Sequence, residues 1–141
     1  MQQAPKIVAL AAAALGLASS CETRPSQAIN RRHIEHVLLS EAANQGPQGL
    51  YAVACVLRNR GWSLVGFQGA QRQDLGAFAH GQPDDVRQAA HDALQAMLSG
   101  GRDITLGANH FANTALGGTP WWAQGRAPTV VIRDHTFWRI E

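Results

Sequence analysis

The sequence predicts a small α+β domain, with helices in the N-terminal two-thirds and a short antiparallel sheet or hairpin at the C-terminus. Residues 31–60 and 84–99 carry apolar side chains three and four positions apart, which is the period of a helix with one buried face. Beyond residue 102 the chain changes to short runs of β-branched and aromatic residues separated by turn residues. The length of 141 residues suits one domain with a modest core.

The first 21 residues have the pattern of a signal peptide. Lys6 precedes an apolar run over 7–18 and small residues before Cys21, and this run is too short to span a membrane permanently. The stretch Leu17–Cys21 resembles a bacterial lipoprotein box, in which the cysteine is lipidated and anchors the mature protein. The alternative is cleavage near Ser20 without a lipid. We therefore expect export to the cell envelope or periplasm, with or without membrane anchorage.

The remaining chain is expected to form a polar tether over 22–30 and a catalytic domain over 31–141. Once Lys6 is removed, eleven arginines face ten acidic residues, which excludes a polycationic nucleic-acid-binding protein. Cys55 lies in an apolar run and is predicted to be a free, buried and inert thiol. No cofactor is expected, and we expect a monomer.

The first helix is expected to begin near Arg31, with Asn30 as its cap, and it holds the acidic residue of greatest interest. Ile34, Val37, Leu38 and Glu41 follow one another at helical spacing, so Glu41 ends an apolar stripe. A carboxyl against apolar walls has a raised pKa and can act as a general acid near neutral pH. The alternative is a helix that ends early, which leaves Glu41 as a solvated carboxylate.

Further helices and a loop follow. After a Gly-Pro turn, residues 48–60 are apolar nearly all round, which predicts a central helix. Residues 61–83 predict an irregular loop with at most a short helix near 71–75, and long loops in small domains often line sites. A third helix is expected from a cap at Asp84 or Asp85 to the glycines at 100–101.

The C-terminal part is expected to be extended. The predicted pieces are 108–113, the pair Trp121-Trp122, and a hairpin of 129–133 with 135–140.

Two blocks of this sequence resemble the bacterial cell wall hydrolase family that includes the spore cortex-lytic enzymes. The first block is Glu41-Ala-Ala-Asn-Gln-Gly-Pro-Gln-Gly-Leu-Tyr-Ala-Val-Ala-Cys-Val-Leu-Arg-Asn-Arg60. The second combines Gly107-Ala-Asn-His-Phe-Ala-Asn113, Pro120-Trp-Trp-Ala123 and His135-Thr-Phe-Trp-Arg139. The resemblance covers nearly all of residues 33–140, although the segment between the blocks departs from the family pattern.

The resemblance implies a lysozyme-like fold and cleavage of the β-1,4 bond between N-acetylmuramic acid and N-acetylglucosamine in peptidoglycan, with Glu41 as the catalytic acid. A glycoside hydrolase usually needs a second carboxylate, and Asp74, Asp103 and Asp134 are weak candidates for an N-acetylmuramidase. A lytic transglycosylase needs only one glutamate, because the muramic C6 hydroxyl attacks within the same sugar. We therefore favour a lytic transglycosylase.

Sugar-binding residues are expected among aromatic and amide side chains, which stack on sugar rings and hydrogen-bond to them. The candidates are Tyr51, Asn109, Phe111, Asn113, Trp121 and Trp122. Asn59, which lies in the first block, His110 and His135 are expected to support the site, the two histidines as hydrogen-bonded organisers of the sheet.

Two other functions are open at this point. A zinc peptidase or amidase would need a metal site, but His110 and His135 lack a third ligand at suitable spacing, and no metal is expected. A non-catalytic peptidoglycan-binding lipoprotein would keep the fold and lack the chemistry.

Overall fold

The structure is a computed structural model that describes residues 28–141. The predicted signal peptide (1–21), lipidation at Cys21 and most of the tether lie outside the described residues. Within the described part, no helix has both the length and the apolar character needed to cross a membrane.

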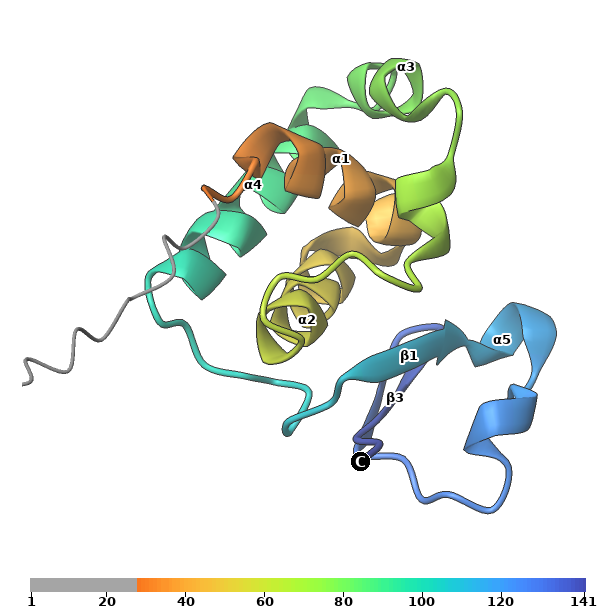
Figure 1. The fold of residues 1–141 in the computed structure, drawn as a ribbon. Helices are drawn as coiled ribbons and strands as arrows, with labels where there is room; N and C mark the ends of the chain where they lie inside the picture. Colours follow the sequence, from red (N-terminus) through yellow and green to blue (C-terminus); the bar gives the residue numbers. More distant parts are fainter. Residues whose placement is uncertain (1–27) are drawn as a thin grey trace, which may run out of the picture.

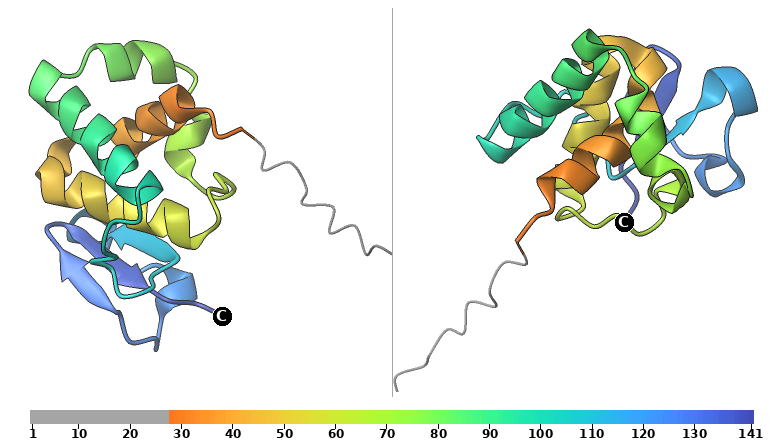
Figure 2. Two further views of the ribbon diagram at one scale, coloured as in Figure 1. Left: turned by 90° about the vertical axis from the view of Figure 1, so that its left-hand side faces the viewer. Right: turned by 90° about the horizontal axis from the view of Figure 1, so that it is seen from above.

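The described chain has a helical layer and a small sheet that lies against one side of it (Figure 1). The helical layer contains α1 (Arg31–Ala42), α2 (Gly46–Asn59), α3 (Leu75–His80) and α4 (Asp84–Leu98). The sheet contains β1 (His110–Asn113), β2 (Val130–Ile132) and β3 (His135–Trp138), with the short helix α5 (Thr114–Gly117) after β1. The other views in Figure 2 show the sheet beside α2, which contacts both β1 and β2. The predicted α+β fold, helices first and sheet last, is confirmed.

The first two helices form as the apolar spacing predicts. The Asn30 side chain caps α1 by accepting a hydrogen bond from the His33 N–H at 3.1 Å. Glu41 lies inside α1, which continues to Ala42, so the alternative of a helix that ends before Glu41 is wrong. Helix α2 buries residues 52–57 completely and is the centre of the core, and Pro47 occupies its first turn, where a missing N–H costs nothing.

The segment between α2 and α4 is more regular than expected. A 3₁₀ turn spans Gln68–Gln71 and α3 spans Leu75–His80, so the short helix expected near 71–75 begins where that prediction ends. The six-residue helix α3 is too short to display a clear period in the sequence. The predicted caps of α4 are also wrong, because Pro83 precedes the helix and Asp84 and Asp85 lie in its first turn, where carboxylates favour the helix dipole.

The sheet is antiparallel, with β3 between β1 and β2. The predicted hairpin turns at Arg133, which adopts a positive φ of 52°, a conformation that costs a residue other than glycine some strain. Residues 121–123 form a 3₁₀ turn and are not extended, and α5 was not anticipated.

Alternation along β3 separates two groups of side chains. His135 and Phe137 lie on one face with Phe111, whose ring is 5.2 Å from His135 and 5.8 Å from Phe137. Trp138 lies on the opposite face and contacts Trp122 edge to face, with ring centroids 5.2 Å apart. The sheet therefore presents one aromatic face to the helical layer and another to the segment after α5.

Gln45, at the junction of α1 and α2, connects the helical layer to the hairpin. Its side chain is fully buried. The Gln45 Nε2 donates to Asp134 Oδ2 at 3.1 Å, and its Oε1 accepts from the Asp134 backbone N–H at 3.1 Å. This reciprocal pair fixes the start of β3 relative to the end of α1.

Gln45→Met is expected to lower the free energy of unfolding by about 1–3 kcal/mol, because it keeps the side-chain volume but removes the hydrogen bonds to Asp134. Urea denaturation measures the change. Gln124→Met, at an exposed glutamine whose side chain donates to the Thr119 carbonyl, is the control and should change stability by less than about 0.5 kcal/mol. Equal effects of the two substitutions would show that the Gln45 connection does not stabilise the fold.

Candidate active site

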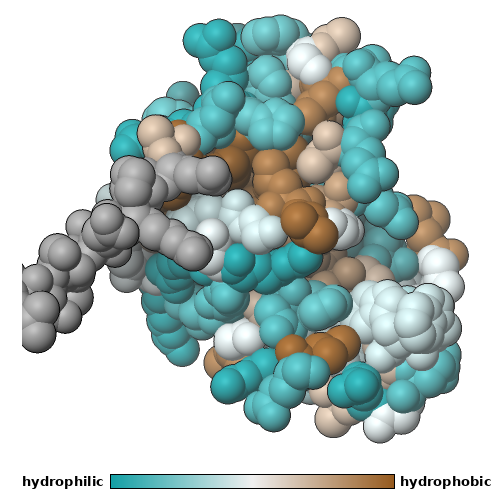
Figure 3. Space-filling view, in the orientation of Figure 1, coloured by the Kyte–Doolittle hydropathy of each residue, from teal (hydrophilic) through white to brown (hydrophobic). Residues whose placement is uncertain are grey.

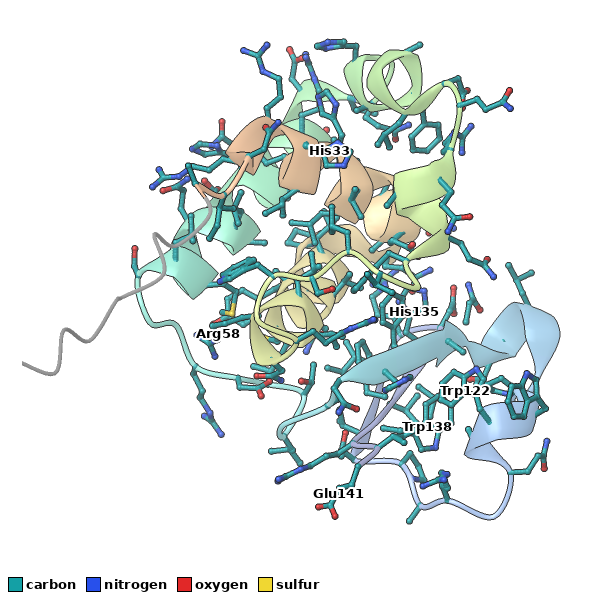
Figure 4. All side chains as sticks on the ribbon, in the orientation of Figure 1. His33, Arg58, Trp122, His135, Trp138 and Glu141 are labelled. Atoms are coloured by element: carbon teal, nitrogen blue, oxygen red, sulfur yellow. The ribbon has the colours of Figure 1, made fainter. Side chains whose placement is uncertain are left out.

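An open cleft of about 610 Å³ lies between the helical layer and the sheet. Its lining comes from four parts of the chain. They are the end of α1 with the turn after it (Ser40, Glu41, Asn44), the segment after α2 (Arg60, Gly66, Phe67, Gln68), β1 with the segment after it (His110, Phe111, Ala112, Asn113, Leu116, Gly117, Pro120, Trp122), and His135. In Figure 4 His135 lies between the helical layer and the sheet, whereas Trp122 and Trp138 lie together beyond β1. The face drawn in Figure 3 is mostly hydrophilic, with hydrophobic residues gathered across the middle of its upper, helical part.

Glu41 enters the cleft from the last turn of α1. Its Oε1 accepts a hydrogen bond from the Gly69 backbone N–H at 2.6 Å. Burial raises the pKa of Glu41, and the hydrogen bond from Gly69 opposes this rise without cancelling it. The protonated form is therefore favoured at higher pH than for an ordinary glutamate, as a general acid requires.

Gly69 brings the 3₁₀ turn at 68–71 close to Glu41, and there is no space for a side chain at this position. A Cβ atom on Gly69 would lie 2.8 Å from Glu41 Oε1 and 3.0 Å from both Cβ and Oγ of Ser40. The absence of a side chain therefore allows the backbone N–H to reach the carboxyl. The sequence gives no periodic signal that distinguishes Gly69 from the other glycines of this loop.

The pKa of Glu41 predicts how stability depends on pH. A carboxyl whose pKa is higher in the folded than in the unfolded protein stabilises the fold below its ordinary pKa of 4.5, and this contribution is lost as pH rises through the folded value. The melting temperature of Glu41→Gln minus that of the unsubstituted protein should therefore increase between pH 4 and pH 7.5. Scanning calorimetry at both pH values measures the difference, and a gap that does not change with pH would contradict the raised pKa.

Aromatic rings form the sheet side of the cleft. Trp122 packs against His110 with ring centroids 5.2 Å apart, and Phe111 lies 5.8 Å from Phe67 on the loop. The Arg60 guanidinium lies over the Phe67 ring at 4.7 Å from its centroid. These rings offer flat apolar surfaces of the kind on which sugars stack.

Three of the six predicted sugar-binding residues line this cleft, namely Phe111, Asn113 and Trp122. The Asn113 Oδ1 also caps α5 by accepting from the Leu116 N–H at 3.1 Å. Both predicted supporting histidines line the cleft as well. His110 has the expected hydrogen bond, from Nδ1 to Asn109 Oδ1 at 2.8 Å, whereas the expectation of a hydrogen-bonded His135 is wrong for its Nδ1, which has no partner among residues 28–141.

The other three predicted sugar-binding residues, Tyr51, Asn109 and Trp121, are not among the residues that line this cleft. The Tyr51 hydroxyl donates to the Arg102 carbonyl at 2.7 Å on the α4 side of α2. The Asn109 side chain pairs with the backbone of Ile140, which ties the C-terminal end to β1. Trp121 is 86 % exposed and points away from the core. Of the adjacent tryptophans, only Trp122 faces the cleft.

Asn59, the third predicted supporting residue, is not among the residues that line the cleft. Its Nδ2 donates to Asp103 Oδ2 and to the Ala108 carbonyl, both at 2.8 Å, and so fixes the segment that leads into β1. Asp103 also accepts from Thr105 and Gly107. Burial acts to raise the pKa of Asp103, but the hydrogen bonds from Thr105, Asn59 and Gly107 together outweigh burial and lower it. Asp103 is therefore an ionised structural residue.

Of the residues that line the cleft in the described part, Glu41 is the only carboxylate. The other two candidates also have structural partners. Asp74 is exposed and pairs with Arg72 at 2.5 Å, whose hydrogen bond lowers the pKa of Asp74. Asp134 bonds Gln45. Glu41 is therefore the one acidic side chain that the described residues place in the cleft lining.

Several cleft residues were not identified from the sequence. Ser40, Asn44, Phe67 and Gln68 line the cleft because they flank Glu41 or Gly69 in space. Arg60 is the last residue of the first block. Its position directly after the buried helix α2 was the one feature of the sequence that could have indicated a place in the cleft.

Among the described residues, no three histidine, cysteine, aspartate or glutamate side chains cluster in a way that could hold a metal ion. The described cysteine, Cys55, is buried and free as predicted, and burial raises the pKa of its thiol to about 11.

No protein-family model matches this sequence, and no curated protein matches it. Two solved structures resemble the fold. One is the catalytic domain of the germination-specific lytic transglycosylase SleB from Bacillus anthracis, which is 24% identical, with a TM-score of 0.52 over 77% of this chain and 93% of that one. The other is the catalytic domain of the Bacillus cereus SleB protein, with the same identity, TM-score and coverage of this chain, and 88% coverage of its own. The likeness shows that this chain has the fold of these catalytic domains.

Proposed function

We propose that this protein cleaves the glycan strands of peptidoglycan as a lytic transglycosylase, with Glu41 as its single catalytic carboxyl. The observation that carries the proposal is the position of Glu41 in the cleft. It is half-buried, has a raised pKa and has no second carboxylate beside it among the described lining residues. The likeness to the SleB catalytic domain, a lytic transglycosylase, supports the same reaction.

In the proposed reaction, the Glu41 carboxyl donates its proton to the oxygen between N-acetylmuramic acid and N-acetylglucosamine as the bond from C1 of the muramic acid breaks. The Glu41 carboxylate then accepts the proton of the muramic C6 hydroxyl as that oxygen attacks C1. The products are a 1,6-anhydromuramic end and a free N-acetylglucosamine end. One carboxyl serves both steps, and no water is consumed.

The cleft walls suit a sugar chain. Trp122 and Phe111 add aromatic rings to the cleft lining, while Asn113, Asn44 and Gln68 add amide groups for hydrogen bonds. The Gly69 N–H holds the carboxyl in one orientation.

Mass spectrometry of peptidoglycan digested with the purified protein tests the reaction. We expect muropeptides that end in 1,6-anhydromuramic acid. Reducing ends without the anhydro group would support an N-acetylmuramidase that recruits another group, and an undigested substrate that still binds the protein would support a binding module.

The N-terminal sequence supports a proposal for where in the cell the protein works. We propose that the chain is exported to the cell envelope through its first 21 residues and works there as a monomer, held at the membrane if Cys21 is lipidated. The intact mass of the protein recovered from cells tests this, because signal removal and a lipid on Cys21 each give a distinct mass.

A further inference from the structure

His135 is a buried polar side chain without a complete set of partners. It is 3% exposed, it lines the cleft, and its Nδ1 has no hydrogen-bond partner among residues 28–141. Buried polar atoms are nearly always paired, and each exception needs an explanation. His110, the other histidine of the cleft, has its Nδ1 paired with Asn109.

The surroundings of His135 favour one form of its ring. Burial lowers the pKa of His135, and the charge of Asp134 opposes this only in part, so the imidazole is neutral at neutral pH. A neutral imidazole carries one N–H and one lone pair. Because an N–H buried without an acceptor is rarer than an under-satisfied acceptor, the lone pair belongs on Nδ1 and the proton on Nε2. The ring therefore offers Nε2–H as its donor.

Apolar rings lie beside the His135 ring. Phe111 lies 5.2 Å from the His135 ring and 5.8 Å from Phe67, and both phenylalanines line the cleft. A ligand that suits this corner has a hydrogen-bond acceptor next to a small apolar group. A sugar hydroxyl has no methyl group beside it, whereas an acetamido group has a carbonyl oxygen next to a methyl.

We propose that His135 and Phe111 recognise the N-acetyl group of a peptidoglycan sugar. The Nε2–H of His135 donates to the acetamido carbonyl oxygen, and the Phe111 ring packs against the acetamido methyl. The glycan nature of the ligand rests on the proposed function. His135 determines specificity and transfers no proton in the reaction.

A double-mutant cycle on binding tests the contact. The full chain carrying Glu41→Gln, which leaves substrate intact, is compared with the same chain carrying His135→Phe in addition. The ligands are a tetrasaccharide of alternating N-acetylglucosamine and N-acetylmuramic acid, and its de-N-acetylated form. Removal of the acetyl groups leaves free amines on the sugars. Any effect of these amines that is common to both proteins cancels in the cycle.

Removal of the acetyl groups should weaken binding about threefold to tenfold more when His135 is present than when phenylalanine replaces it, the range of one neutral hydrogen bond. His91→Phe, at an exposed histidine of α4 that is not among the residues lining the cleft, is the control and should leave the ratio of the two dissociation constants unchanged. Equal ratios with and without His135, or no binding of the acetylated tetrasaccharide, would overturn the proposal.

A measurement that leaves His135 in place covers the case in which His135→Phe does not fold. Nitrogen NMR of the imidazole in the Glu41→Gln protein should show the proton on Nε2, and the Nε2 signal should move on addition of the acetylated tetrasaccharide but not of the de-N-acetylated one. A proton on Nδ1, or the same response to both ligands, would contradict the proposal. These measurements need no turnover, so they separate a failure of this contact from a failure of the proposed reaction.

Discussion

Glu41→Gln is expected to lower the rate of peptidoglycan cleavage by about 10²–10⁴-fold, because the amide cannot donate the proton that the leaving oxygen needs. The substitution keeps the shape of the side chain, and its amide oxygen can still accept the hydrogen bond from the Gly69 N–H. Release of soluble muropeptides from peptidoglycan measures the loss.

Binding of the variant to insoluble peptidoglycan is the control for this experiment. It should remain close to that of the unsubstituted protein, since the aromatic wall of the cleft is intact. Residual cleavage within tenfold of the original rate would show that another group supplies the proton. Binding without cleavage by both proteins would identify a binding module.

Gly69→Ala is expected to reduce cleavage by about a hundredfold, the scale of a reacting group displaced by about an ångström. The added methyl would lie 2.8 Å from Glu41 Oε1 and 3.0 Å from the Ser40 side chain, so the turn or the carboxyl must move. The movement also breaks the hydrogen bond that orients Glu41. Initial rates at saturating peptidoglycan measure the effect.

Gly76→Ala is the matched control for this change. Gly76 lies in α3, and a Cβ atom there would meet nothing within 4 Å. The control should retain full activity and gain about 0.5–1 kcal/mol of stability, because alanine loses less backbone freedom than glycine when a helix forms. If the two substitutions have equal effects on activity, the close approach of Gly69 to Glu41 has no catalytic importance.

The sequence predicted the helices and the hairpin in which apolar residues recur at a regular spacing. The stripe from Ile34 to Glu41 identified both α1 and its acidic residue, and the β-branched run before Arg133 identified the hairpin. The position of α3 was predicted wrongly and α5 was not predicted, because one or two turns of helix are too short to show a periodic spacing of apolar residues. The 3₁₀ turn at 68–71 was not predicted for the same reason, so the close approach of Gly69 to Glu41 was not predicted either.

The roles of individual side chains were harder to predict, because each role depends on the direction in which the side chain points. Helix α2 is apolar nearly all round, so its pattern could not show that Tyr51 faces Arg102 and not the cleft. Trp121 and Trp122 are adjacent, and only the 3₁₀ turn decides which of them faces the cleft. His135 was expected to be hydrogen-bonded, and its Nδ1, which has no partner among residues 28–141, is visible only in three dimensions.

The order of the strands places β1 at the edge of the sheet, and residues of β1 line the cleft. An open edge is a template on which another chain can add a strand, and long open edges promote aggregation. Here β1 spans only His110–Asn113 and runs directly into α5, which ends the ladder. The cleft can thus remain accessible to a carbohydrate strand while offering too few backbone groups to seed amyloid-like growth.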